Sequence, residues 1–300
     1  ILTTHEGAAG MMADVCGRLT GRPGVCFGTF GPGATNLATG VGGALLDRSP
    51  MIALTDEFGP EMRGRIVQMG IDHQALFAPI TKKTTRLQAD QVKSIFFDAA
   101  NVALSARPGP VHIGLPVGMS AEEAKNENVQ FNLPAPPPSA DAKALRKAVQ
   151  LFSEARKPVI ALGLGAVSAH AGARIRKLAE RFNVPVVLTP MAKGLISEDH
   201  PCYAGVLFHA LSDMVGTIHA QADLILGVGY DPVEFNYESW MPDVPLVSID
   251  TSPADLDQST YTLAADVVGD IMTGLDAILA LPRSAKDWNM TALEKHRAAM

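Results

Sequence analysis

Short apolar runs bounded by glycine or proline alternate with segments of helical periodicity along most of this 300-residue chain. Runs of this kind are typical of strands in a parallel sheet that is buried on both faces. They occur at residues 25–30, 51–55, 110–116, 157–162, 184–188, 222–229 and 245–250. Because strands that alternate with helices form parallel sheets with helices on both faces, the sequence predicts an α/β fold with doubly wound parallel sheets.

The segment between residues 121 and 140 separates two such α/β halves. It is first charged and then proline-rich, a composition typical of an extended, semi-rigid linker. A helix is expected to follow it, with Asp141 as the N-cap. The predicted organisation is a first domain at 1–125, a linker at 126–140, a second domain at 141–282 and a polar helical connector at 283–300.

The composition argues against several classes of protein. A formal net charge of −6 and the lack of a Lys/Arg-rich run argue against nucleic-acid binding. No apolar run reaches the ~18 residues of a membrane span, and no signal peptide is visible. Cys16, Cys26 and Cys202 form no Cys-x-x-Cys pair, so we expect reduced thiols and a cytoplasmic protein. Because the chain begins with Ile1, in what looks like the end of a strand, we expect a fragment of a longer protein.

Two neighbouring segments near the N-terminus have the features of a ligand site. Glu6 lies where the expected strand end at 1–4 passes into a helix, and small residues follow it. Ligands of open α/β sheets bind at this edge. The turn Gly31-Pro32-Gly33 then ends the next strand and begins a helix, whose free N–H groups could meet a polar or anionic ligand. A plain strand–helix turn is the alternative.

The two segments together resemble a known family. The run His5-Glu6-x-Ala-Ala-x-x-Met-Ala-Asp, followed by Gly31-Pro-Gly-Ala-Thr-Asn36, is similar to the pyrimidine-binding domain of thiamine diphosphate enzymes, and most similar to the acetolactate synthase group. The segments 44–47, 75–82, 107–111 and 198–201 agree with this group, and the second half resembles its middle domain, which is Rossmann-like. The resemblance covers nearly the whole chain. Phe30 departs from it, because the family usually has a small hydroxyl residue there.

The resemblance implies roles for individual residues. Glu6 would hydrogen-bond the pyrimidine N1′ of the cofactor, so that the cofactor's own 4′-imino group can remove the thiazolium C2 proton. Partial burial is expected to raise the pKa of Glu6, as this role requires. The alternative is an acid that merely favours the first turn of a helix. Gly31, Pro32 and Gly33 would let the backbone approach the cofactor ring, and Asn36 is a further candidate.

A long polar segment at 56–74 is expected to border the substrate channel, as it does in relatives. Gln68, Gln74 and Lys82 are the candidates for contact with substrate, and solvated loop side chains are the alternative. The helix expected at 34–46 is rich in small residues. In the family it lies near a dimer interface, but tight packing within one subunit would explain the same composition.

The sequence lacks the motif residues that would bind a metal ion, FAD or NAD in this chain. The Mg²⁺ and diphosphate site of the family lies in a third domain, which the sequence at 268–271 does not match, so no metal site is expected in this chain. The segment 230–235 lacks the arginine-rich run of FAD-binding members, which argues against FAD. Gly163-x-Gly165 lacks the third glycine of a dinucleotide site, which argues against NAD.

The expected function is therefore that of an acetolactate synthase-like carboligase, which decarboxylates pyruvate and transfers the two-carbon unit to a second 2-oxo acid. It would belong to branched-chain amino acid or acetoin metabolism. The resemblance implies a homodimer or homotetramer with active sites between subunits, and an inactive fragment. The alternatives are a sulfoacetaldehyde acetyltransferase or another thiamine diphosphate-dependent 2-oxo acid decarboxylase. A non-catalytic nucleotide-binding or regulatory α/β protein is the alternative of another class.

Overall fold

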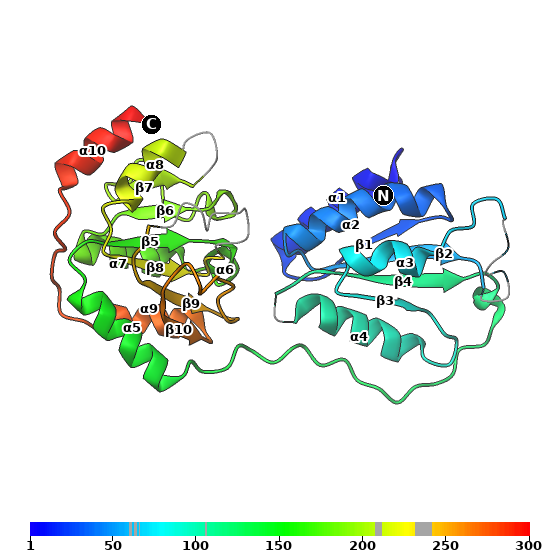
Figure 1. Cartoon of the computed structure of the whole chain (residues 1–300). Helices are drawn as coiled ribbons and strands as arrows, with labels where there is room; N and C mark the ends of the chain where they lie inside the picture. The colour runs from blue at the N-terminus through cyan, green and yellow to red at the C-terminus, as the bar shows by residue number, and fades with distance from the viewer. Residues whose placement is uncertain (60–61, 63–64, 66, 106, 208–211, 232–241) are drawn as a thin grey trace. The chain divides into compact units, whose positions relative to one another are not determined.

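The computed structural model describes residues 1–59, 62, 65, 67–105, 107–207, 212–231 and 242–300. The chain divides into two compact units, Ile1–Ala135 and Pro136–Met300, which are described separately (Figure 1). The division falls inside the proline-rich segment at 126–140. Within the described ranges, no helix has both the length and the hydropathy needed to cross a membrane.

The first unit is built on a four-stranded parallel sheet with the strand order β1-β2-β4-β3. The strands are β1 (Gly24–Gly28), β2 (Met51–Glu57), β3 (Lys83–Arg86) and β4 (Pro110–Pro116). The helices are α1 (Glu6–Thr20), α2 (Pro32–Leu46), α3 (His73–Phe77) and α4 (Val92–Leu104). Helices α1 and α2 cover one face of the sheet and α4 lies on the other, as Figure 1 shows. The strands therefore contribute to two separate apolar cores.

Strand β1 is covered on one face but not on the other. Cys26 lies in the core beneath α1 and α2, whereas Val25 is 61% exposed and Phe27 is 48% exposed. The reason is that α4 packs against Ile52, Val111 and other residues of β2 and β4, and β1 lies beyond them in the sheet.

The second unit is built on a six-stranded parallel sheet with the order β10-β9-β8-β5-β6-β7. The strands are β5 (Pro158–Leu162), β6 (Val186–Leu188), β7 (Tyr203–Val206), β8 (Leu224–Val228), β9 (Leu246–Asp250) and β10 (Leu263–Val268). The helices are α5 (Ala142–Glu154), α6 (Leu164–Ser168), α7 (Gly172–Phe182), α8 (Ser212–His219), α9 (Ile271–Leu279) and α10 (Met290–Ala299). The apolar core of β5, β8 and β9 is completely buried, as expected for parallel strands with helices on both faces. Two all-parallel sheets with helices confirm the predicted α/β fold class.

The structure differs from the sequence prediction in residues 1–4 and in three strands. Residues 1–4 form no strand, Ile1 and Leu2 are fully exposed, and none of the described strands pairs with these residues. Strands β3, β7 and β10 were not expected. Residues 283–300, expected as a polar helical connector, contain the helix α10 and pack on the second unit, since Trp288 and Leu293 are buried there and Arg297 donates a hydrogen bond to a backbone carbonyl of that unit. Asp141 caps α5 as predicted, accepting a hydrogen bond from the backbone of Ala144 at 2.8 Å.

The small residues of α2 have different environments. A Cβ atom at Gly40 would lie 2.7 Å from the Cα of Gly10, so α1 and α2 touch through their backbones at this point. Gly43 has no described atom of the first unit near its Cβ position, and Gly42 has only a methyl group at 3.8 Å. Packing within one chain therefore explains Gly40, but it does not explain Gly43.

This difference predicts opposite effects of two matched substitutions. Gly40→Ala should lower the free energy of unfolding by about 1–3 kcal/mol, because the added methyl group meets backbone atoms that cannot move independently. Gly43→Ala should raise it by about 0.5–1 kcal/mol, since alanine favours the helix and the space is open. Urea denaturation of both variants checks this. Equal destabilisation by both would mean that Gly43 also lies in a packed interface.

Candidate functional site

Glu6 is the first residue of α1 and lies at the carboxyl edge of the first sheet. The preceding residue, His5, is the N-cap, and its Nδ1 accepts a hydrogen bond from the backbone N–H of Gly7 at 3.0 Å. His5 is therefore a helix-edge residue, as expected. The cap leaves the Glu6 side chain half-buried and directed toward the turn that begins α2.

The glycine turn has a backbone conformation that suits glycine. Gly31 is the N-cap of α2 and has φ 49° and ψ −106°. A Cβ atom here would lie 2.6 Å from the carbonyl oxygen of Met69, so a side chain is excluded by space as well as by conformation. Pro32 follows as the first helical residue, a position where proline is favoured because its missing N–H is not needed.

Glu6, Gly33 and Asn36 lie together at this edge. The side-chain amide of Asn36 donates a hydrogen bond to Glu6 Oε2 at 3.0 Å. A Cβ atom at Gly33 would lie 3.5 Å from Glu6 Oε1 and 2.8 Å from a methyl group of Thr29, so the glycine keeps the space beside this second oxygen open. The site thus presents one carboxylate oxygen held by Asn36 and another next to a gap where a side chain would otherwise lie.

The pKa of Glu6 differs from the expectation. The hydrogen bond from Asn36 lowers the pKa of the carboxyl group, helped by a backbone N–H and by His5, and together they outweigh the opposing effect of burial. The predicted rise is therefore not seen in this chain. Burial of the half-exposed side chain is too slight to overcome a direct hydrogen bond to the charged form.

The three candidates for substrate contact have three different environments. Gln68 lies exposed in the turn before α3. Gln74 is half-buried and hydrogen-bonded within the unit, since its amide donates to Glu57 and to the backbone carbonyl of Thr85. The ammonium group of Lys82 donates to the backbone carbonyls of Ser105 and Arg107 at 2.6 and 2.9 Å.

The two hydrogen bonds of Lys82 to backbone carbonyls give this residue a structural role. They fix the turn between α4 and β4, and burial lowers the pKa of its ammonium group. The structure brings none of Gln68, Gln74 and Lys82 into contact with Glu6, and a role in substrate binding stays a prediction for each.

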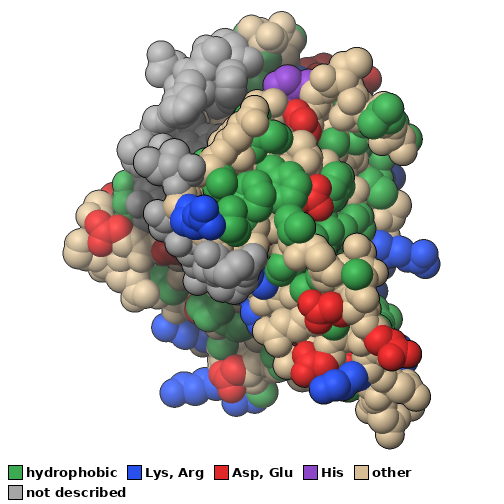
Figure 2. Space-filling model, turned by 90° about the vertical axis from the view of Figure 1, so that its right-hand side faces the viewer, with side chains coloured by type: hydrophobic (Ala, Val, Ile, Leu, Met, Phe, Trp, Pro, Cys, Tyr) green, Lys and Arg blue, Asp and Glu red, His purple; other side chains and the backbone are tan. Residues whose placement is uncertain are grey.

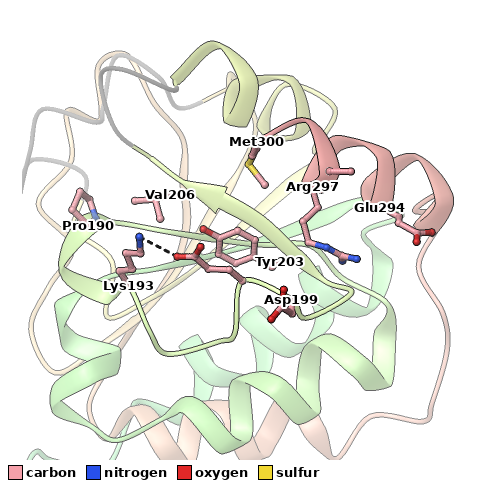
Figure 3. Close-up of a pocket in the computed structure, with 10 residues that line it drawn as sticks. Pro190, Lys193, Asp199, Tyr203, Val206, Glu294, Arg297 and Met300 are labelled. Atoms are coloured by element: carbon pink, nitrogen blue, oxygen red, sulfur yellow. Dashed lines mark ion pairs between the residues drawn. The ribbon is translucent and has the colours of Figure 1, made fainter.

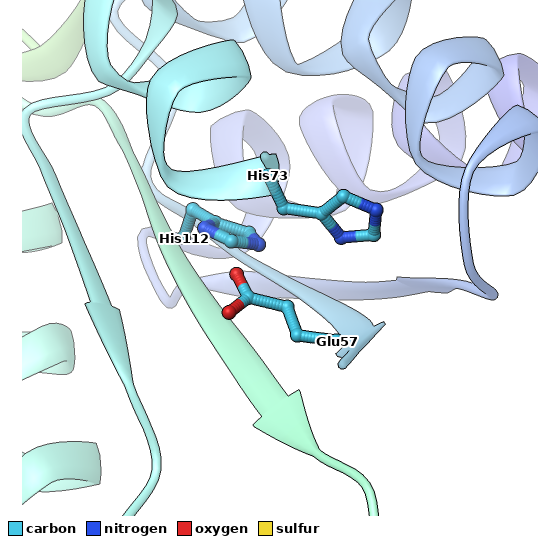
Figure 4. A group of neighbouring side chains, drawn as sticks. All are labelled: Glu57, His73 and His112. Atoms are coloured by element: carbon cyan, nitrogen blue, oxygen red, sulfur yellow. The ribbon is translucent and has the colours of Figure 1, made fainter. Parts of the chain in front are cut away.

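A cluster of buried polar side chains was not predicted. Glu57, His73 and His112 lie at the carboxyl end of β2, at the start of α3 and within β4, with their polar atoms within 4.8 Å of one another (Figure 4). Such a set is able to bind a metal ion. Each of these residues is isolated among apolar or loop residues in the sequence, so no spacing signal would have revealed the cluster.

Apolar side chains gather at the same edge of the sheet. In Figure 1 the arrows of β2 and β4 point toward the side of the unit that faces the viewer in Figure 2, where apolar side chains occupy the middle of the face. Phe30 stacks on Phe58, with ring centroids 4.7 Å apart. Phe30 also lines a cavity of about 510 Å³ together with Leu115, Val117 and other residues. The residue that departs from the family pattern thus forms part of an apolar wall.

The second unit has a cavity of about 690 Å³ beside α10, shown in Figure 3. Two cations line it, but both have partners: Lys193 pairs with Glu198 at 3.0 Å, and Arg297 donates to the carbonyl oxygen of His200. Asp199 and Glu294 also line it. Because its acids outnumber its cations, this cavity is unfavourable for the phosphate groups of a nucleotide.

The two glycines of Gly163-x-Gly165 pack against the backbone of the turn that follows β8 in the second sheet. The N–H of Gly165 donates to the carbonyl oxygen of Gly229 at 3.0 Å, and Cβ atoms at these positions would collide with that backbone. Close packing therefore explains them without a dinucleotide. The FAD argument concerns the segment 230–235, of which residues 232–235 lie outside the described residues.

The residues expected to touch a thiamine diphosphate pyrimidine ring fit that group. A ring nitrogen needs a carboxylate oxygen without a neighbouring side chain, and Glu6 Oε1 beside Gly33 offers one. The Gly31-Pro32-Gly33 turn presents backbone only. Asn36 then orients the carboxylate through its second oxygen.

Both units match models of one protein family. Residues 1–76 match the model described as "Thiamine pyrophosphate enzyme, N-terminal TPP binding domain", and residues 145–278 match "Thiamine pyrophosphate enzyme, central domain". The two matches together cover more than half of the chain, and they fall one on each unit.

Acetolactate synthases are among the relatives of the chain. It is 34% identical over 283 residues to the "Probable acetolactate synthase large subunit" of Methanococcus aeolicus, which covers 90% of this chain and 47% of that protein. The protein of the same description from Methanocaldococcus jannaschii is 34% identical over 292 residues, 93% of this chain and 49% of its own length. The "Acetolactate synthase large subunit" of Corynebacterium glutamicum is 31% identical over 299 residues, 95% of this chain and 47% of its own length.

The chain spans about half the length of these relatives. The family models agree with the fold and with the motifs around Glu6 and Gly31. On these grounds the chain belongs to the thiamine pyrophosphate enzyme family and is similar to acetolactate synthase large subunits.

Proposed function

We propose that this chain supplies the pyrimidine-binding and central domains of an acetolactate synthase-like carboligase, which decarboxylates pyruvate and transfers the two-carbon unit to a second 2-oxo acid. The observation that carries the proposal is the arrangement of Glu6 and Asn36 beside Gly33. A carboxylate held at one oxygen and open at the other suits the ring nitrogen of the cofactor. The similarity to acetolactate synthase large subunits supports the reaction type.

The residues of this chain would act by position and charge. When bound, thiamine diphosphate supplies the carbon nucleophile that attacks the 2-oxo acid. Glu6 would hydrogen-bond the ring nitrogen N1′ and hold or release a proton there. Asn36 keeps the Glu6 carboxylate in one orientation and favours its charged form. The proximity of a ring nitrogen and the loss of solvent on binding would then raise the pKa of Glu6.

Several parts of the proposal rest on the family alone. The Mg²⁺ ion and the diphosphate would be held by residues outside this chain. A homodimer or homotetramer with shared active sites and a cytoplasmic location also remain predictions from the resemblance, as does the inactivity of the chain by itself.

The position of Phe30 keeps a second reaction open. It stacks on Phe58 in an apolar wall where the family usually has a small hydroxyl residue, so a substrate pocket at this place would differ from that of typical members. A sulfoacetaldehyde acetyltransferase or another 2-oxo acid decarboxylase is therefore the second candidate.

Incubation of the full-length gene product with pyruvate, thiamine diphosphate and Mg²⁺ tests the reaction. Both pyruvate loss and acetolactate formation should be seen. Cofactor binding without pyruvate consumption would favour the second candidate, and absence of cofactor binding would favour a non-catalytic protein.

Glu6→Gln should lower turnover by about 10²–10⁴-fold while the cofactor still binds, because the amide cannot exchange a proton with a ring nitrogen. Steady-state kinetics and calorimetric cofactor binding measure the two effects. The matched control is Glu123→Gln, which makes the same chemical change at an exposed residue near the end of the first domain and should leave turnover unchanged. Unchanged turnover in Glu6→Gln would remove Glu6 from the mechanism.

Asn36→Ala should raise the pKa of Glu6, since it removes the hydrogen bond that stabilises the charged carboxylate. Asn36→Asp should raise it further, because a like charge would then face Glu6. NMR titration of the Glu6 carboxyl carbon measures both shifts in this chain without cofactor. Thr35→Ala is the control, since the Thr35 hydroxyl donates to the carbonyl oxygen of Pro32. A pKa that is the same in all three variants would show that Asn36 does not govern Glu6.

A further inference from the structure

The glycine turn is attached to the interior of the first unit through a histidine. The buried backbone N–H of Gly31 donates a hydrogen bond to His73 Nε2 at 3.3 Å. His73 is the first residue of α3 and is only 3% exposed. Since a Cβ atom at Gly31 would meet Met69, the turn lies between the imidazole and the segment that precedes α3.

The hydrogen bonds of His73 fix which of its nitrogens carries the proton. Nε2 accepts from Gly31, so a neutral ring has its proton on Nδ1. Nδ1 lies 2.8 Å from the hydroxyl oxygen of Thr55, to which it then donates. The Thr55 hydroxyl in turn lies 2.8 Å from Nε2 of His112 and donates its proton there. One N–H group at the turn thus sets the proton positions of two histidines.

The series of hydrogen bonds continues from His112 to the ion pair between Glu57 and Arg86. With Nε2 of His112 as acceptor, its Nδ1–H donates to Thr84, at 2.7 Å. The Thr84 hydroxyl donates to the side-chain oxygen of Gln74 at 2.8 Å, and the Gln74 amide donates to Glu57. Arg86 donates to the other carboxylate oxygen of Glu57 at 2.6 Å. From the Gly31 N–H to the Gln74 amide every donor has an acceptor and the hydrogen bonds run in one direction, and they end at Glu57, which also accepts from Arg86.

Burial keeps both rings neutral. His112 is fully buried, and desolvation lowers its pKa to about 3; desolvation also lowers the pKa of His73, against the opposing charges of Glu57, Asp72 and Asp56. A charged His73 would have a proton on Nε2 facing the Gly31 N–H. The neutral state is therefore the one that allows the contact with the glycine turn.

The set Glu57, His73 and His112 is also a candidate for a metal ion, but its hydrogen bonds oppose this use. The unprotonated nitrogen of His73 is occupied by Gly31, and that of His112 is occupied by Thr55. Both oxygens of Glu57 accept hydrogen bonds, from Gln74 and from Arg86. A metal ion would have to break several of these contacts, including the one to the glycine turn.

We propose that His73 is a positioning residue for the cofactor site: through Thr55 and His112 it is held in one tautomer, and in that tautomer it fixes the Gly31-Pro32-Gly33 turn beside Glu6. The inference rests on the proposed function for its consequence, because the turn matters if a cofactor ring lies on it. The positioning of the turn itself is a property of this chain.

The first test is made on the chain without cofactor. His73→Phe keeps the ring volume but removes the acceptor of the Gly31 N–H, and hydrogen exchange at that amide should become about tenfold faster. Thr55→Val keeps the shape but removes the acceptor of Nδ1–H, and ¹⁵N NMR should show a mixture of the two His73 tautomers. His219→Phe is the matched control, since His219 is a buried histidine of the second unit. It should change neither quantity.

The outcomes separate positioning from general stability. Faster exchange at Gly31, with amides of β2 and β4 unchanged, supports the proposal. Unchanged Gly31 exchange in His73→Phe overturns it, as does a wild-type His73 with its proton on Nε2. If His73→Phe does not fold, Thr55→Val decides through the tautomer signal. Displacement of the imidazole signals by stoichiometric Zn²⁺ would also overturn it, in favour of a metal site.

Calorimetry on the full-length gene product tests the consequence for the cofactor. His73→Phe should weaken thiamine diphosphate binding about tenfold in the presence of Mg²⁺, as expected for loss of one fixed contact surface. His219→Phe should bind as the wild type does. If the wild type does not bind the cofactor, the proposed function fails while the result at Gly31 stands. Equal affinity of His73→Phe and wild type would overturn the role in cofactor positioning.

Discussion

The first unit depends on the pairing of polar groups that its own sheet buries. Strands β2 and β4 lie at the centre of the sheet, and each carries polar residues where apolar ones would be expected: Thr55 and Glu57 in the first, His112 in the second. An unpaired group at such a place costs a large part of a domain's stability. These buried residues therefore require polar side chains in the neighbouring segments, and α3 and β3 supply them as hydrogen-bond partners.

Most strands could be predicted from the sequence because they are apolar on both faces. The exceptions have a physical reason. Strand β3, Lys83–Arg86, is polar and lies at one end of the sheet, where its side chains need not be buried. Residues 283–300 have a polar composition, but a few apolar side chains such as Leu293 are enough to attach them to the second unit. Such packing depends on the surface it meets, and no local pattern reveals it.

Candidate site residues could be named from the sequence where they form a contiguous motif, and could not where they converge from separate elements. Glu6 and Gly31-Pro32-Gly33 became candidates because the chain places them in recognisable runs, and Asn36 belongs to the second of these. The lowered pKa of Glu6 was missed because it depends on how Asn36 faces the carboxylate. The link from His73 to His112 through the Thr55 hydroxyl depends on α3, β2 and β4 meeting in the folded unit. The hydrogen bond from the Lys82 ammonium group to the Ser105 carbonyl likewise forms only once the turn after α4 is folded, so no sequence pattern reveals it.

The uncovered face of β1 has a consequence for handling this protein. Val25 and Phe27 form an apolar strip on a strand that lies at the end of the sheet, where only β2 among the described strands pairs with it. Strands with these two properties recruit other strands, and natural proteins suppress this with charged or proline residues at the sheet edge. The first unit produced separately would be prone to aggregate through this strand. A lysine in place of Val25 would act as a gatekeeper there, away from the edge of the sheet that carries Glu6.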